Sequence, residues 1–143
     1  MDTEYFENSW RVCCLGGFLF GREALKRMLP KKKGTVIFTG ASASLRGRAN
    51  FGAFNSAKSG LRTLAQAMSK EYGPEGIHVA HVIIDGAING EKIKTNAPEY
   101  AAKLGEEGVI NLEGIVDSYV YLHRQHPQAW TFEQDLRTSV EKW

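Results

Sequence analysis

The sequence has no apolar run long enough to cross a bilayer. Its longest uncharged apolar run, residues 12–20, has nine residues and includes two glycines, whereas a spanning helix needs about 20 apolar residues. Asp2, Glu4 and Glu7 stand near the start of the chain, where a secretory leader would be basic. We therefore expect a cytoplasmic protein with no membrane partner.

Cysteine is scarce and the net charge is small. Cys13 and Cys14 are the two cysteines, and because they are neighbours they close no long loop and lack the spacing of metal ligands. We expect both to be buried and reduced, and we predict no metal site. A net charge of +2 gives little attraction to a phosphate backbone. The basic run 31–33 is expected to be a solvated turn at a helix end, so nucleic acid is not predicted as a partner.

The sequence also lacks the closely spaced glycines of phosphate-binding loops. No two of its 15 glycines are two residues apart, so the dinucleotide-binding turn G-x-G-x-x-G does not occur. Two glycine pairs have the spacing of a nucleoside triphosphate loop, but neither is followed by lysine. Gly16, Gly17 and Gly21 are expected to allow close helix packing instead.

What is present is an alternation of helical and strand-like segments. Apolar residues spaced by three and four predict helices over 3–29 and 52–72, and a third from the N-cap Asn111 towards Pro127. Short β-rich runs predict strands at 35–39, 77–84 and 130–136. His78 and His81 should face opposite sides of their strand. Residues 89–108 are expected to form a loop with a short helix near 99–104.

This rhythm indicates an α/β fold with a parallel sheet, because right-handed crossovers place helices over the sheet. We expect one partial domain over residues 1–143, with about three strands and three main helices. The strand 35–39 is apolar at consecutive positions, which favours a strand in the middle of a sheet. Since the chain opens with a helix, that strand has no preceding partner, and we expect an upstream half to be missing.

The segment 34–64, GTVIFTGASASLRGRANFGAFNSAKSGLRTL, resembles the short-chain dehydrogenase/reductase family. That family carries a serine at a strand end and, thirteen residues on, a Tyr-x-x-x-Lys motif at a helix start, which FNSAK resembles. Residues 10–17, 73–86 and 131–137 extend the similarity over the second half of such an enzyme. The resemblance implies a Rossmann-like, doubly wound parallel sheet that lacks its first, glycine-rich half.

The resemblance also implies a catalytic site with three of its four residues replaced. Phe54 stands in the tyrosine position, Ala41 in the serine position and Cys13 in the asparagine position. Phenylalanine has no hydroxyl with which to transfer a proton. Lys58 remains as a vestigial catalytic residue.

The cofactor contacts that the resemblance implies are Lys58, Gly86 and Ile88, while Gly90 stands where the family often has a threonine. NAD(P) is implied by the resemblance alone, and we expect this chain not to bind it tightly. Four polar residues near the site are expected to act structurally. Ser42 and Ser44 would satisfy loop backbone groups, Ser56 would lie in the first helical turns, and Asp85 would cap a turn with Gly86.

We interpret the chain as a degenerate short-chain dehydrogenase/reductase-like protein without independent dehydrogenase activity, acting through association. The alternative is an NAD(P)-dependent oxidoreductase of a small carbonyl or alcohol, either as the tail of a longer gene product or with an atypical site. Self-association is expected through helices 3–29 and 52–72 or through an exposed strand edge at 35–39. A dimer through the helices would bury Phe18, Leu25, Leu61 and Met68.

Overall fold

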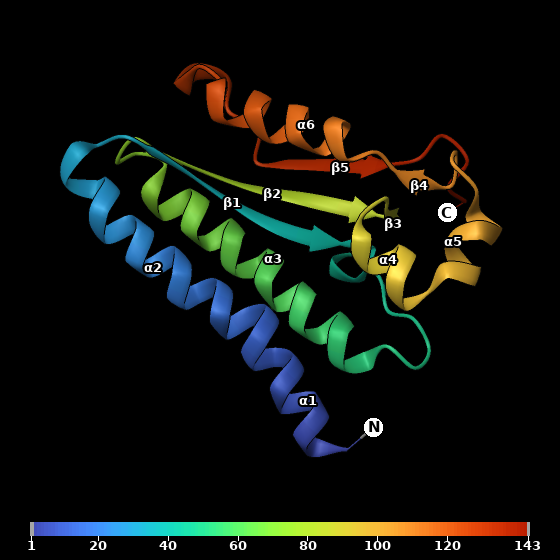
Figure 1. Ribbon diagram of the computed structural model, residues 1–143. Helices are drawn as coiled ribbons and strands as arrows, with labels where there is room; N and C mark the ends of the chain where they lie inside the picture. The colour runs from blue at the N-terminus through green and yellow to red at the C-terminus, as the bar shows by residue number, and fades with distance from the viewer. Residues whose placement is uncertain (1, 143) are drawn as a thin grey trace.

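Three parallel strands form the centre of the molecule (Figure 1), whose computed structural model describes residues 2–142. They are β1 (Gly34–Ala41), β2 (Ile77–Asp85) and β5 (Glu133–Arg137), in the spatial order β1-β2-β5. All nine residues of β2 are buried because this strand has a neighbour on each edge and helices over each face. The predicted α/β fold with a parallel sheet is confirmed.

Helices cover both faces of this sheet. On one face lie α3 (Gly52–Tyr72) and a long N-terminal helical segment, in which a π-helical turn (Arg11–Leu15) joins α1 (Thr3–Trp10) to α2 (Gly16–Met28). On the other face lies α6 (Leu112–Arg124). The side chain of Asn111 accepts a hydrogen bond from the backbone N–H of Gly114 at 2.9 Å, which confirms the predicted N-cap.

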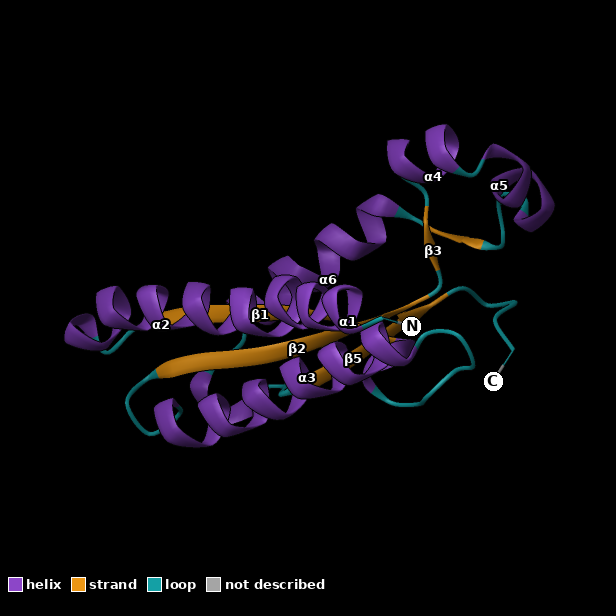
Figure 2. Cartoon of the chain, turned by 90° about the horizontal axis from the view of Figure 1, so that it is seen from below, coloured by secondary structure: helices purple, strands orange, loops and turns teal. Residues whose placement is uncertain are grey.

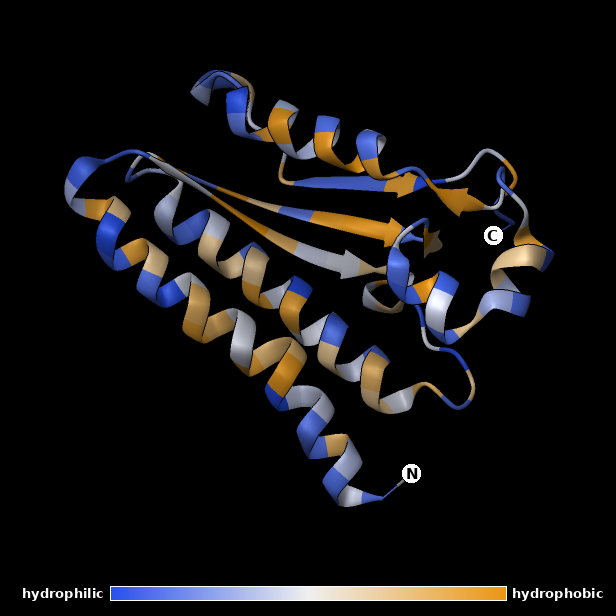
Figure 3. Ribbon diagram, in the orientation of Figure 1, coloured by the Kyte–Doolittle hydropathy of each residue, from blue (hydrophilic) through white to orange (hydrophobic). Residues whose placement is uncertain are grey.

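The core has two parts because side chains alternate along β2. Odd-numbered residues such as Ile77 and Val79 pack towards α2 and α3, whereas Ala80 and Val82 pack towards α6. Figure 3 shows apolar residues along β2 and on parts of the helices beside the sheet. The buried members of the two clusters are Leu25, Val36, Phe38, Leu61, Ala65, Met68, Ile77 and Val79 in one, and Ala80, Val82, Ile84, Ile110 and Leu122 in the other.

The position of β1 corrects the prediction of a mid-sheet strand. Within the described residues β1 pairs with β2 alone, from Gly34↔Ile77 to Ala41↔Ile84, and β2 is the central strand. The apolar run in β1 shows that helices cover both faces of the strand, and it does not show whether other strands pair with both of its edges. Val36 and Phe38 pack on the α2 and α3 side, and Ile37 packs on the α6 side.

Residues 87–110 are more regular than predicted. The two-residue strands β3 (Ala87–Ile88) and β4 (Val109–Ile110) pair in parallel, and between them lie α4 (Glu91–Asn96) and α5 (Pro98–Leu104). Only α5 was expected. Figure 2 shows α4 and α5 beyond the end of the sheet. Elements this short contain too few residues to display a period, which is why sequence patterning missed them.

The last strand begins later than predicted. Pairing with β2 starts at His81↔Glu133, so Trp130 precedes β5. Its indole ring instead stacks on His78, with ring centroids 4.9 Å apart and planes 2° from parallel. None of the helices within residues 2–142 combines the length and apolar content of a membrane-spanning segment.

Two of the three predicted close-packing glycines have that role. A Cβ on Gly17 would lie 2.5 Å from Leu61 Cδ1, and one on Gly21 would lie 2.9 Å from Phe38 Cζ and 3.0 Å from Met68 Cε. A Cβ on Gly16 would meet only its own helix, 3.5 Å from the Arg11 carbonyl oxygen. The prediction is therefore correct for Gly17 and Gly21 and wrong for Gly16.

This difference predicts opposite effects of the same substitution. Gly21→Ala gains about 1 kcal/mol of helix propensity but forces a methyl group against a buried ring, which costs about 1–3 kcal/mol, so we expect a net loss of about 1 kcal/mol. Gly16→Ala, the control, should raise the free energy of unfolding by up to about 1 kcal/mol. Urea denaturation measures both, and equal effects of the two substitutions would contradict the packing described for Gly21.

Candidate functional site

The candidate site lies at the carboxyl ends of β1 and β2, where ligands of open parallel sheets commonly bind. A cavity of about 600 Å³ opens there between the loop after β1, the start of α3 and the residues after β2. Ala41, Phe54 and Gly86 are among its lining residues, whereas Lys58 and Ile88 are not. The cavity is lined by Ala41, Ser42, Ala43, Arg46, Gly47, Arg48, Phe51, Phe54, Asn55, Ile84, Asp85, Gly86, Ala87, Tyr100, Glu141 and Lys142.

Lys58 is held by the edge strand. Its ammonium donates a hydrogen bond to the backbone carbonyl oxygen of Thr39 at 2.9 Å. It also lies 5.8 Å from the centre of the Phe54 ring, because residues four apart share a helix face. The Thr39 hydroxyl shares a hydrogen bond of 2.7 Å with the hydroxyl of Tyr119 on α6, and burial raises the pKa of that tyrosine. Thr39 therefore ties helices from both faces to β1.

Asn55 organises the loop that forms one wall of the cavity. Its side-chain amide donates to the carbonyl oxygens of Ala43 and Arg46 at 3.3 and 2.7 Å, and its side-chain oxygen accepts from the Arg48 N–H at 3.1 Å. Asn55 was not among the residues predicted from the sequence. A usable signal existed, since asparagine is a weak helix former whose side chain competes for backbone groups.

The serines near the site divide into structural groups and one that lines the cavity. Ser44 is buried, and its hydroxyl accepts from the Ala41 N–H at 3.2 Å. Ser56 donates to the Ala53 carbonyl oxygen within its own helix at 2.9 Å. Both roles confirm the predictions. Ser42 alone of the three lines the cavity.

Asp85 does not act as a turn cap, which corrects the prediction. Its side chain is 4% exposed, and its carboxylate accepts from the Arg46 guanidinium at 3.2 and 3.3 Å and lies 3.7 Å from that of Arg137. A charge buried this deeply requires such partners. The chain then turns through Gly86 with φ of +153°, a conformation that side chains disfavour. Asp85 thus fixes the cavity loop to the ends of β2 and β5.

Cys13, in the family's asparagine position, lies on the π-helical turn and is not among the cavity-lining residues. It is half-buried, so the prediction that both cysteines are buried holds only for Cys14. Burial and the neighbouring Cys13 raise the pKa of the Cys14 thiol.

The two histidines of β2 face opposite sides, as predicted. Nδ1 and Nε2 of His78 lie 3.1 Å and 2.9 Å from the carbonyl oxygens of Leu122 and Thr131, and a ring N–H donates to one of them. Nδ1 of His81 lies 2.9 Å from Glu133 Oε2, but its Nε2 has no hydrogen-bond partner. Each histidine thus has a hydrogen-bond partner within the core. Within residues 2–142 no three His, Cys, Asp or Glu side chains gather as metal ligands.

His81 belongs to an ionic cluster beneath the site. Arg62 on α3 makes two hydrogen bonds to the Glu133 carboxylate, at 2.6 and 2.8 Å, and this guanidinium lowers the pKa of Glu133. Burial lowers the pKa of His81 despite the opposing effect of Glu133. A neutral His81 thus donates from Nδ1, and the cluster joins α3, β2 and β5.

This cluster predicts acid-sensitive stability. Unfolded His81 takes up its proton near the ordinary value of 6.5, whereas the folded ring has a lower pKa, so stability is complete above that value and is lost as the pH falls through the folded pKa. The lowered pKa of Glu133 adds a loss below its ordinary value of 4.5. The free energy of unfolding in urea should fall between about pH 7.5 and 5.

His81→Asn tests the assignment, because it keeps an N–H for Glu133 and removes the titration. We expect a shallower pH slope in this variant and an unchanged slope in His126→Asn, which alters an exposed histidine outside the cluster. Equal slopes in all three proteins would contradict the assignment.

Known proteins resemble this chain in sequence and structure. The family model described as short chain dehydrogenase matches residues 1–100. A peroxisomal 2,4-dienoyl-CoA reductase of Saccharomyces cerevisiae is 32% identical over 131 residues, covering 85% of this chain and 43% of the relative. A protein of Xanthobacter autotrophicus named inactive 2-(S)-hydroxypropyl-CoM dehydrogenase 2 is 33% identical over 87 residues, covering 61% of this chain and 37% of the relative.

A solved short-chain dehydrogenase from Rhodopseudomonas palustris is 37% identical, with a TM-score of 0.74 over 95% of this chain and 53% of that one. The fold and the sequence match together define an oxidoreductase-like α/β protein. This chain belongs to the short-chain dehydrogenase family. It spans less than half the length of the two curated relatives.

Proposed function

We propose that this chain, by itself, does not carry out the hydride transfer of its family and acts through association. The observation that carries the proposal is the pairing of Phe54 with Lys58. The ring in the tyrosine position has no hydroxyl, and the ammonium four residues on is hydrogen-bonded to the Thr39 carbonyl oxygen. Loss of a positioned proton donor removes about 10²–10⁴ in rate.

Other hydroxyl and ionisable side chains line the cavity, among them Ser42, Asp85, Tyr100, Glu141 and Lys142, but none of them stands in the tyrosine position of the family motif. Tyr100 is 54% exposed on α5, and the carboxylate of Asp85 accepts hydrogen bonds from Arg46. This supports the loss of the family's own proton relay.

The described residues do not fit a complete nicotinamide dinucleotide site. Of the three residues that the resemblance implies as cofactor contacts, only Gly86 lines the cavity, while Lys58 is bonded to the protein's own backbone. We therefore derive no reaction step through NAD(P), and we expect no tight binding of it to this chain.

The competing proposal is an NAD(P)-dependent oxidoreductase of a small carbonyl or alcohol. The retained cavity of about 600 Å³ and the retained Lys58 favour it. Relatives of this chain include both a named reductase and a protein named inactive, so an assay of this chain must separate the two proposals.

Restoring the two family side chains should not create activity. Ala41→Ser with Phe54→Tyr supplies a donor and a proton carrier, but a donor accelerates nothing unless a cofactor is held beside it. We expect NAD(P)H consumption by the double variant to equal that of the control Phe51→Tyr, which adds a phenol at a lining position outside the motif. Product-linked NAD(P)H oxidation by the unmodified chain, over a panel of carbonyl compounds, would overturn the proposal.

Two surfaces support self-association. The outer edge of β1 has no strand partner within residues 2–142, and an open edge offers backbone groups to another strand. The N-terminal helical segment exposes apolar side chains, including Val12 of the π-helical turn at 67% and Phe20 of α2 at 75%.

The residue-level expectation for a helical dimer is corrected by the burial pattern. Leu25, Leu61 and Met68 are buried within this chain and contact its own sheet, whereas Phe18 is 38% exposed. A partner at this face would therefore cover residues such as Phe18 and Phe20 rather than the buried three.

We expect a species larger than the 15.9 kDa monomer in size exclusion with light scattering at micromolar concentration. Val12→Lys with Phe20→Lys should shift it towards the monomer if the helical face carries the contact. The control, Val116→Lys with Tyr121→Lys, changes two exposed residues of α6 and should leave the mass unchanged. A cooperative monomeric species from the unmodified chain would contradict association.

A further inference from the structure

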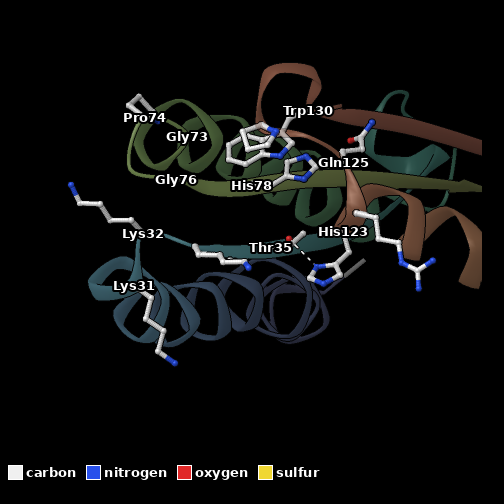
Figure 4. Close-up of a pocket in the computed structure, with 14 residues that line it drawn as sticks. Lys31, Lys32, Thr35, Gly73, Pro74, Gly76, His78, His123, Gln125 and Trp130 are labelled. Carbon is white, nitrogen blue, oxygen red and sulfur yellow. Dashed lines mark hydrogen bonds between the residues drawn. The ribbon is translucent and has the colours of Figure 1, made fainter.

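A second cavity, larger than the candidate site, lies at the other end of the sheet. It has a volume of about 920 Å³ and is formed by the turn after α2, the amino ends of β1 and β2, and the segment that follows α6. It shares no lining residue with the candidate site at the carboxyl ends. Figure 4 shows Lys31 and Lys32 at its rim with their side chains extending outwards, and His78 with Trp130 at its wall.

The charge around this cavity has one sign. Lys31, Lys32, Lys33 and Arg124 line it together with His123, and no lining residue is acidic. Glu75 lies between two lining residues, Pro74 and Gly76, but does not line the cavity itself.

Helix ends alone do not account for this charge. The helical segment through Lys31 and helix α6 both end here, and each helix C-terminus carries a partial charge of about −0.5. The four positive charges of the three lysines and Arg124 exceed the summed partial charge of the two helix ends severalfold. A concave wall with excess charge of one sign attracts ligands of the opposite sign.

The cavity also has a fixed aromatic wall. Two backbone carbonyl oxygens hold the ring of His78, and the partly exposed indole of Trp130 stacks on it in parallel, at 4.9 Å. His123 is held as well, by the Thr35 hydroxyl at 3.1 Å. An aromatic plane fixed in this way suits stacking with a flat ring.

We propose that this cavity binds a small, multiply charged phosphate ligand that carries a flat ring. The phosphates would lie among the lysines of residues 31–33 and Arg124, and the ring would lie against Trp130. The volume suits a ligand of this size, since small-molecule pockets measure about 300–1,000 Å³. The lysine chains at the rim are long enough to turn inwards around the phosphates. This site is independent of the function proposed for the other end of the sheet.

Calorimetry with the full chain at low salt tests the proposal, using ADP, pyrophosphate and adenosine as probes. We expect ADP to bind with a dissociation constant below about 1 mM. Pyrophosphate lacks the ring and adenosine lacks the charge, so each should bind at least about tenfold more weakly. If pyrophosphate bound as tightly as ADP, the site would recognise only the phosphates. If adenosine bound as tightly as ADP, the lysines would not contribute to binding. Either result overturns the proposal, as does no binding of ADP.

Variants locate the binding. Lys31→Gln, Lys32→Gln and Lys33→Gln together should weaken the binding of ADP at least about tenfold. The matched control, Lys92→Gln with Lys94→Gln and Lys103→Gln, removes the same charge from exposed positions on α4 and α5 and should change the affinity for ADP less than about twofold. Equal losses in both would indicate non-specific attraction and overturn the proposal.

Two further measurements complete the assignment. Trp130→Phe should weaken ADP and leave pyrophosphate unchanged, and Arg48→Gln, in the other cavity, should leave ADP unchanged. Loss of ADP binding in Arg48→Gln would place ADP at the wrong end of the sheet. Tighter binding of an oligonucleotide than of ADP would assign this face to nucleic acid. Both results would overturn the proposal.

Discussion

The complete burial of β2 is the constraint on which the rest of the structure depends. Nine consecutive buried residues require a strand on each edge and a helix layer on each face. The order β1-β2-β5 meets the first requirement, and α3 and α6 meet the second. Polar side chains in this strand then need partners inside the protein, which explains the bonds of His78, His81 and Asp85.

Those partners determine how the two ends of the sheet are built. At the carboxyl end, the carboxylate of Asp85 lies close to the guanidinium groups of both Arg46 and Arg137. The Arg46 contact helps to orient the loop after β1, which Asn55 also binds. At the amino end, the ring of His78 provides the support for Trp130. Each cavity is thus lined by one buried polar residue of β2, His78 at the amino end and Asp85 at the carboxyl end.

Long periodic elements were predictable from the sequence, and contacts across the fold were not. The helix over 52–72 shows a clear period, the strand from residue 77 shows a nearly continuous apolar run, and the N-cap role of Asn111 follows from its residue type and position. A local apolar pattern shows only that both faces of a strand are covered. It therefore predicted β1 correctly as a strand but wrongly in the middle of the sheet. The Asp85 ion pair joins residues 39 positions apart, and no local pattern reveals such a partner. The spacing of the family motif singled out Ala41, Phe54 and Gly86, which line one cavity. It gave no information about the hydrogen bond between Lys58 and Thr39.

The π-helical turn between α1 and α2 fixes the angular relation between the two halves of the N-terminal segment. Such a turn accommodates one residue more than a regular helix over the same path. Deleting one residue within the range Arg11–Leu15 would therefore leave a regular helix over the same path. Trp10, now 41% exposed, would stay on its side of the helix, and the packing of Leu25 would stay in place. The N-terminal segment can thus absorb a one-residue change in length at this turn without exchanging its buried and exposed faces.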